Sequence, residues 1–167
     1  MKRLVFTLFV LLLLVSCTNN VVDAENDKYL RYQHYYENIL DNLNFSQNSA
    51  FYDLEVVMNR LNDGTYRYDI ILDNPQIAMY DVEIMTVENN TKYEAATKMF
   101  PCFGIFEDQE YNLVPYQVNF EEGYVKGIII SGISENSTLN IKIRVSWKDY
   151  SKVNETKEYL ELNVSVN

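Results

Sequence analysis

The chain has 167 residues and a formal net charge of −10, with 14 Lys and Arg against 24 Asp and Glu. This acidic balance argues against nucleic acid as a partner, because phosphates bind Lys and Arg, and against direct adhesion to an anionic membrane. One His, two Cys and five Gly also leave little material for a zinc site or a glycine-rich phosphate loop.

The first sixteen residues predict a secretory signal. Lys2 and Arg3 precede LVFTLFVLLLLV at positions 4–15, a run in which only Thr7 is polar. As a helix this run would be about 18 Å long, which is short of the ~30 Å hydrocarbon core of a membrane. We therefore expect a cleaved signal peptide over residues 1–16. The alternative is an uncleaved signal anchor.

The apolar run ends in Leu14-Val15-Ser16-Cys17. This tetrapeptide resembles the lipobox of bacterial lipoproteins, in which an aliphatic, a small or β-branched and a small residue precede Cys. The resemblance covers residues 1–17 and implies cleavage between Ser16 and Cys17, with diacylglyceryl and N-acyl lipid on Cys17. Such chains would anchor the protein firmly on the extracytoplasmic face of the cell membrane. The alternative is a chance Cys at an ordinary cleavage site.

Cleavage would leave 151 residues, enough for one domain, with a net charge of −12 because Lys2 and Arg3 are lost. Cys102 would then be the only unmodified cysteine, so no intramolecular disulfide is expected, as is common in bacterial exported domains. We interpret the five Asn-x-Ser/Thr sequons as coincidence in an Asn- and Ser-rich chain. They begin at Asn44, Asn89, Asn136, Asn154 and Asn163.

Residues 17–26 predict the lipidated Cys and a polar tether, and residues 27–44 predict an amphipathic helix. Its apolar positions recur at steps of three and four and are Tyr29, Tyr32, Tyr36, Ile39 or Leu40, and Leu43. Asn26 or Asp27 would cap its start. We expect the helix to pack on the domain, and the alternative is docking to a partner helix.

From residue 50 the apolar period becomes two, which is typical of β-strands. Residues 51–72 predict a hairpin, because Asn62-Asp63-Gly64 favours a tight turn between two alternating runs. Further alternating faces follow at 78–84, 139–147 and 160–166. Residues 124–131 predict a strand covered on both faces. Proline interrupts the apolar pieces 99–106 and 113–120, which places them at an edge, a bulge or a strand end.

We expect a mainly β fold: an immunoglobulin-like two-sheet antiparallel sandwich of about 7–9 strands over residues 50–167, preceded by one N-terminal amphipathic helix. One sheet could not cover this much apolar surface, so two should pack face to face. The paired core cysteines of antibody domains are absent, since Cys102 stands alone and Trp147 comes late. The immunoglobulin likeness is therefore an analogy.

No catalytic, cofactor or metal site is predicted. We expect His34 to be an ordinary helix residue, and no G-x-S-x-G nucleophile motif is present. Cys102 lies between Pro101 and Phe103, which favours a buried, inert thiol. The acidic segments 107–110 and 121–122 could supply calcium ligands, but they lack EF-hand spacing and we expect solvated loops.

Fourteen tyrosines are the strongest compositional bias. Tyrosine combines a large rigid ring with a hydroxyl group, which suits recognition surfaces, although it is also a common strand residue. The interaction candidates are Tyr32, Tyr35, Tyr36, Tyr111 and Tyr116. We expect a non-catalytic, membrane-anchored extracytoplasmic lipoprotein whose β-sandwich binds an unknown protein or cell-envelope partner. The alternative is a lipoprotein that binds a small ligand or carries a carboxylate-based enzymatic site, such as a glycosidase pair.

Overall fold

A computed structural model describes residues 24–166, so the expected signal peptide, its cleavage position and Cys17 lie outside the described residues. An α-helix covers residues 24–41. The strands are β1 (Asp53–Arg60), β2 (Tyr66–Asp73), β3 (Tyr80–Glu88), β4 (Cys102–Phe103), β5 (Ile128–Ser134), β6 (Thr138–Lys148) and β7 (Glu155–Ser165), with short 3₁₀ helices η1 (Tyr93–Ala95) and η2 (Phe120–Glu122).

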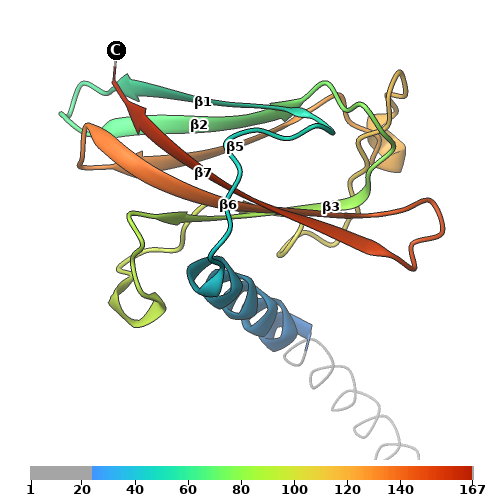
Figure 1. Ribbon diagram of the computed structural model, residues 1–167, viewed down its shortest axis with the longest axis horizontal. Helices are drawn as coiled ribbons and strands as arrows, with labels where there is room; N and C mark the ends of the chain where they lie inside the picture. Colours follow the sequence, from blue (N-terminus) through green and yellow to red (C-terminus); the bar gives the residue numbers. More distant parts are fainter. Residues whose placement is uncertain (1–23, 167) are drawn as a thin grey trace, which may run out of the picture.

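The strands form two antiparallel sheets, β1-β2-β5 and β4-β3-β6-β7. Figure 1 shows the two sheets face to face, with the helix on the outer side of the larger one. Buried side chains from both sheets, including Ile70, Ile84 and Val145, form one core between them. The expected mainly β architecture of two antiparallel sheets is confirmed.

The predicted hairpin over residues 51–72 is also confirmed. β1 and β2 pair from Asp53 opposite Asp73 to Arg60 opposite Tyr66. The Leu61 amide donates to the Thr65 carbonyl at 2.8 Å and closes the turn. Gly64 in this turn has a φ of +89°, a conformation that glycine adopts without steric cost.

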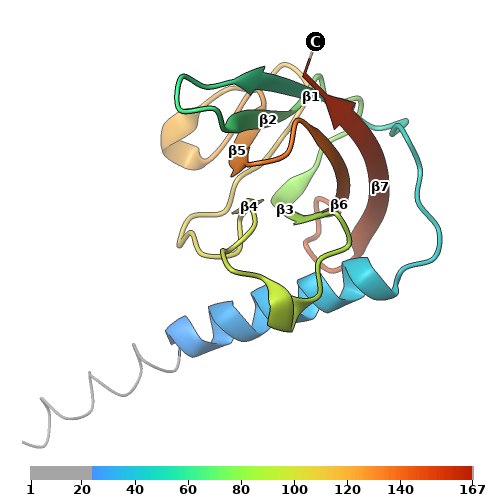
Figure 2. The ribbon, with the colours of Figure 1, turned by 90° about the vertical axis from the view of Figure 1, so that its left-hand side faces the viewer.

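β3 is covered on both faces, whereas the alternating pattern at 78–84 predicted one apolar face. Val82 and Ile84 point into the core between the sheets, whereas Met85 and Val87 pack in a second cluster with the helix. Figure 2 shows the helix lying across the outer face of the larger sheet, with η1 beside it. The pairing of β3 with β6 shifts register between Tyr80 and Glu83, the mark of a β-bulge.

The helix differs from the expected N-terminal amphipathic helix, which was wrong in position and in the extent of its apolar stripe. It spans residues 24–41 rather than 27–44, so Asn26 and Asp27 lie inside it and are not caps. Tyr32, Tyr36 and Ile39 are buried, but both ends of the stripe are solvent-exposed: Tyr29 is 52% exposed and Leu43 is 91% exposed.

The helix ends at residue 41, and Ser46 in the chain that follows it pairs with β7. The Ser46 amide donates to the Tyr159 carbonyl at 2.9 Å, and the Glu161 amide donates to the Ser46 carbonyl at 2.9 Å. These bonds satisfy backbone groups that would otherwise need helical partners. Among the described residues, no helix has the length and hydrophobicity needed to cross a membrane.

One strand prediction was wrong. The strand expected at 124–131 with both faces covered is β5, Ile128–Ser134, and its Ile129 and Ile133 are 62% and 54% exposed because no element of the described residues covers the outer face of β1-β2-β5. The apolar piece 113–120 lies at an edge, as its proline indicated, and contributes isolated bridges such as Leu113 with Met79. Pro115 lacks the donor that a ladder needs.

Candidate functional site

Tyr32 and Tyr36, two of the interaction candidates, belong to the core. They are 3% and 0% exposed, respectively. The Tyr32 hydroxyl accepts a 2.8 Å hydrogen bond from the Phe100 amide, and the Tyr36 hydroxyl donates to the Thr91 carbonyl at 2.9 Å. Burial raises the pKa of Tyr36 to about 12. These rings hold the helix on the domain and offer no surface to a partner.

Tyr35 and Tyr111 are half-buried and also make internal contacts. The Tyr35 hydroxyl donates a 2.7 Å bond to Glu83 Oε2, and the Arg144 guanidinium lies 3.6 Å from the centre of the Tyr35 ring. Tyr111 packs on Phe103 with ring centroids 4.8 Å apart. The helix tyrosines other than Tyr29 therefore face inward, and this part of the tyrosine bias serves packing.

A charged cluster lies between the helix and the larger sheet. Arg31 from the helix pairs with Glu83 of β3 at 2.9 Å. The fully buried Arg144 of β6 pairs with Glu155 of β7 at 2.9 Å and donates to Ser146 Oγ at 2.8 Å. Buried charges need such partners, because leaving water costs several kcal/mol per ion.

Glu83 is the carboxylate of this cluster whose pKa is shifted. Burial raises its pKa above the ordinary 4.5, against the opposing effects of the Tyr35 hydroxyl and the nearby arginines. A cavity of about 130 Å³ adjoins Glu83, Trp147 and Glu155. That volume holds about four water molecules.

A larger cleft, which we call the loop-end cleft, opens where the β2–β3 connection meets the segment after Leu113. It has a volume of about 430 Å³. Its lining residues are Asp73, Asn74, Pro75, Gln76, Val114, Pro115, Tyr116, Gln117, Val118 and Lys126. Figure 1 shows that the β2–β3 connection, the segment with η2 and the β6–β7 hairpin lie at the same end of the domain.

Tyr116, the fifth interaction candidate, stands fully exposed on the rim of this cleft. It occupies a turn closed by a 3.1 Å hydrogen bond from the Gln117 amide to the Val114 carbonyl, with Pro115 before it. The φ of Tyr116 is +64°, where a type II turn favours Gly or Asn and a bulky residue is strained. Such strain recurs at functional sites and is held by the surrounding structure.

Further exposed apolar side chains accompany Tyr116. Val118 and Phe120 follow it along the chain, and Ile77 lies on the β2–β3 connection. Tyr150 and Val153 project from the β6–β7 hairpin. Exposed apolar side chains gathered at one end of a domain are typical of interaction surfaces. Sequence reasoning did not select Val118 and Phe120, because the apolar piece 113–120 was placed at an edge, a bulge or a strand end.

The remaining chemistry-bearing residues stay apart. Within residues 24–166, no group of three or more His, Cys, Asp or Glu side chains is placed to hold a metal ion. Asp108 of the acidic segment 107–110 pairs with Lys28 at 2.5 Å. His34 is exposed on the helix. Cys102 is a half-buried free thiol whose pKa burial raises to about 12, so it is a poor nucleophile at neutral pH.

Comparison with known proteins found no relative of this chain. No family model matches the sequence, and no curated protein is similar to it. No solved structure matches the fold. The function must therefore be argued from the residues themselves.

Proposed function

We propose that this protein is a membrane-anchored extracytoplasmic lipoprotein whose β-domain binds a protein or cell-envelope partner without catalysing a reaction. The anchor is the lipid on Cys17: the thiol takes a diacylglyceryl group, and the signal is then cut between Ser16 and Cys17. The binding surface is the loop-end cleft with Tyr116 on its rim. The single observation that carries the binding role is the fully exposed ring of Tyr116 at a strained φ of +64°.

The anchor proposal is supported by the sequence Leu14-Val15-Ser16-Cys17 after a positive start and a twelve-residue apolar run. Six residues, 18–23, lie between Cys17 and Ala24, the first described residue of the helix, which makes seven Cα–Cα steps. Extended, they span about 23 Å. A domain on so short a tether would stay close to the membrane surface, where an envelope partner would meet it.

We further propose that the domain is an immunoglobulin-like sandwich. The order β1-β2-β5 against β3-β6-β7 matches strands A-B-E against C-F-G of that fold, with sheet-to-sheet crossings after β2 and β5. β4 pairs with β3 rather than joining the first sheet. In immunoglobulin-like domains, loops gathered at one end of the sandwich commonly bind partners, and this supports the loop-end cleft as the site.

A small-ligand or enzymatic role ranks second. The observation that favours it is the raised pKa of Glu83 beside a cavity. However, Glu83 already accepts bonds from Tyr35 and Arg31, and Glu155 already pairs with Arg144. A ligand would have to replace these partners, so the cluster is better suited to docking the helix.

Metabolic labelling tests the anchor. The whole chain, expressed in a bacterium supplied with labelled palmitate, should acquire the label, and Cys17→Ala should remove it. Cys102→Ala is the matched control and should keep the label. Equal labelling of the Cys17 variant would refute the lipid anchor.

Site-directed photocrosslinking tests the binding surface. A photoreactive phenylalanine analogue at Tyr116 should give a discrete adduct in intact cells. The same probe at Leu43, which is 91% exposed outside the cleft, is the control and should not. An adduct that forms equally at both positions, or at neither, would count against the loop-end cleft as the binding surface.

A further inference from the structure

The chain itself covers parts of three of the four sheet edges. Along β3, the Thr86 amide bonds to the Pro101 carbonyl at 3.1 Å and the Met79 amide to the Leu113 carbonyl at 2.8 Å. Along β7, Ser46 makes the two bonds described above. β1 runs beside the last residues of β7, which curls over to meet it (Figure 2). Unpaired edges invite pairing with other chains, so proteins cover them.

β5 is the edge left open among the described residues. One side-chain bond reaches it, from Lys98 Nζ to the Ile133 carbonyl. That bond shows that Ile133 directs its carbonyl away from β2, and antiparallel alternation then gives Ser131 and Ile129 the same outward direction. The sequence of β5, IIISGIS, contains none of the Lys, Pro or charged residues that normally protect an edge.

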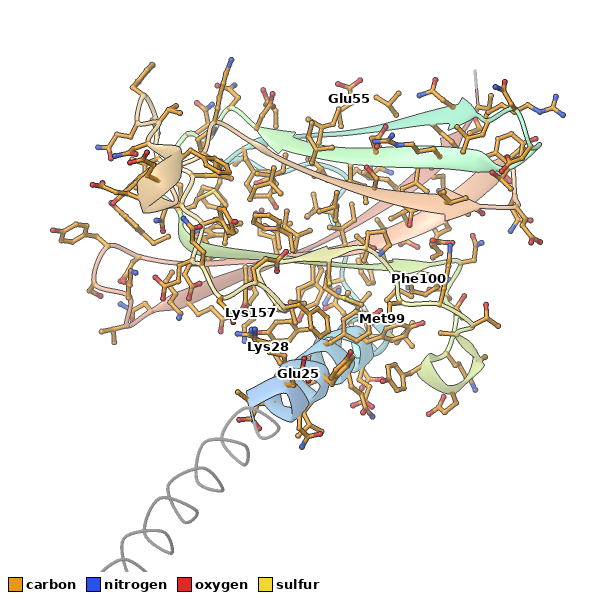
Figure 3. The ribbon with its side chains drawn as sticks, turned by 180° about the vertical axis from the view of Figure 1, so that it is seen from behind. Glu25, Lys28, Glu55, Met99, Phe100 and Lys157 are labelled. Atoms are coloured by element: carbon orange, nitrogen blue, oxygen red, sulfur yellow. The ribbon has the colours of Figure 1, made fainter. Side chains whose placement is uncertain are left out.

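Space for another strand lies along this edge. A groove of about 540 Å³ runs between Ser131, Gly132 and Ile133 on one side and residues 98–101 on the other. Figure 3 views the domain from behind and shows Met99 and Phe100 close to the helix, where Phe100 packs in the helix-side cluster. Gly132 adds no side chain to the groove, and its core side is filled by the Tyr68 ring.

We propose that β5 pairs antiparallel with β5 of a second copy of this chain, about a two-fold axis at Ser131. In that register Ser131 meets its own copy, and Ile129 meets Ile133 of the second copy. Because Ile71 of β2 lies opposite Ile129, three isoleucines form one row across the seam. The two three-stranded sheets join into one sheet of six strands.

The sequence of β5 favours a second copy as the occupant, because the exposed series Ile129, Ser131, Ile133 is its own complement about Ser131. Two chains of net charge −10 repel each other over most of their surfaces, yet β5 carries no charge. The nearest charges on the outer face, Arg67 and Asp69, neutralise each other at 2.8 Å. The Lys98 bond is compatible with the new pairing, because a carbonyl oxygen accepts two hydrogen bonds. This inference does not depend on the lipid anchor.

Disulfide trapping tests the register. In a hydrogen-bonded antiparallel pair the two Ser131 Cα atoms lie about 5.5 Å apart, within disulfide range. The whole chain carrying Cys17→Ser and Ser131→Cys should form a covalent dimer on mild oxidation. Cys17→Ser alone controls for Cys102, and Cys17→Ser with Ser151→Cys controls for random collision, since Ser151 is exposed on the β6–β7 hairpin.

Analytical ultracentrifugation in density-matched detergent tests the association without a cross-link. The whole chain should sediment with a mass twice that of the 19.6 kDa monomer. Ile129→Lys replaces both Ile–Ile pairs across the seam, so it should raise the dimer dissociation constant by about tenfold or more. Val153→Lys, at an exposed site on another element, should leave it unchanged. A monomer at ~100 μM by this measurement, with no Ser131→Cys dimer, would overturn the proposal, as would dimers weakened only by Val153→Lys.

Discussion

The hydroxyl of Tyr68 on β2 donates a 2.7 Å hydrogen bond to Oε1 of Glu88 at the end of β3, and so joins the two sheets beside their open edge. Lys98 pairs with the same carboxylate oxygen at 2.9 Å. Glu88 is 5% exposed and Tyr68 is fully buried. A buried carboxylate depends on such partners, so loss of the Tyr68 hydroxyl alone should lower the stability of the fold.

Removing the hydroxyl in Tyr68→Phe should lower the free energy of unfolding by about 1.5–3 kcal/mol, the usual contribution of a hydrogen bond to a charged group. After the change, the Glu88 carboxylate would keep its ion pair with Lys98 but would lose the hydrogen bond from residue 68. Urea denaturation measures the change, and Tyr66→Phe on the same strand is the control, with an expected change below about 0.5 kcal/mol. Equal losses in the two variants would show that the Tyr68–Glu88 bond adds nothing.

Gly132→Ala should destabilise the fold through the same tyrosine. A Cβ at residue 132 would lie 2.3 Å from Cζ and Oη of Tyr68, well inside contact distance. Overpacking of this kind costs about 1–3 kcal/mol. In a double-mutant cycle, Tyr68→Leu should recover part of that loss because it removes the clashing atoms. Strictly additive losses would contradict the clash.

Local patterns were enough to predict the β1–β2 hairpin, because Asp63-Gly64 and the period-two runs on either side act within a few residues. They were not enough for β5. IIIS at 128–131 is as apolar as a fully covered strand, and only the tertiary arrangement decides that nothing packs on Ile129. The end of the helix was missed for a related reason, since Ser46 pairs with Tyr159, more than a hundred residues away.

In the candidate sites too, local sequence predicts some features, and others depend on tertiary contacts. Strict alternation in β6 places Arg144 and Ser146 on the outer face of the sheet, where polar residues are ordinary. The sequence gives no sign that the helix then covers Arg144 completely. Tyr116 was selected from composition, whereas its strained φ depends on a turn after Pro115 that composition does not reveal.

Tyr116→Asn should stabilise the fold while it weakens binding of the proposed partner. Asn tolerates a positive φ better than Tyr, so relief of the strain should add about 0.5–1 kcal/mol to the free energy of unfolding. Tyr150→Asn, an equally drastic change at a residue without a positive φ, is the control and should add nothing. Thermal and urea unfolding measure stability. A loss of stability in Tyr116→Asn would mean that the ring is held by packing.

The raised pKa of Glu83 predicts a pH-dependent contribution to stability. The folded state holds this proton more tightly than the unfolded state, so the contribution of Glu83 falls as pH rises from about 4.5 through the raised value and is constant above it. Glu83→Gln removes the titration. The unfolding free energy of the variant minus that of the parent, measured between pH 4 and 8, should therefore increase with pH and then level off. A difference that decreases with pH would contradict this assignment.

Arg144 and Glu155 should respond unequally to removal, although they form one ion pair at 2.9 Å. The Arg144 side chain is fully buried, while that of Glu155 is 35% exposed and also pairs with Lys157 at 3.0 Å. Arg144→Met leaves a carboxylate that water and Lys157 can solvate, and Met fills much of the vacated volume, so the loss should stay below about 1.5 kcal/mol.

Glu155→Ala removes the direct ion-pair partner of the buried guanidinium, which keeps Ser146, the Tyr35 ring and the nearby Glu83 carboxylate, and its Nε already lacks a hydrogen-bond partner in the described part of the chain. Breaking a buried ion pair costs about 3–5 kcal/mol, and the loss should be smaller here because Glu83 supplies part of the counter-charge and solvent reaches the Glu155 side. Urea unfolding of both variants, with Lys157→Ala as the control for surface charge, should therefore rank Glu155→Ala as the most destabilised. If Arg144→Met were the more destabilised variant, packing of the arginine side chain would contribute more to stability than its ion pair with Glu155.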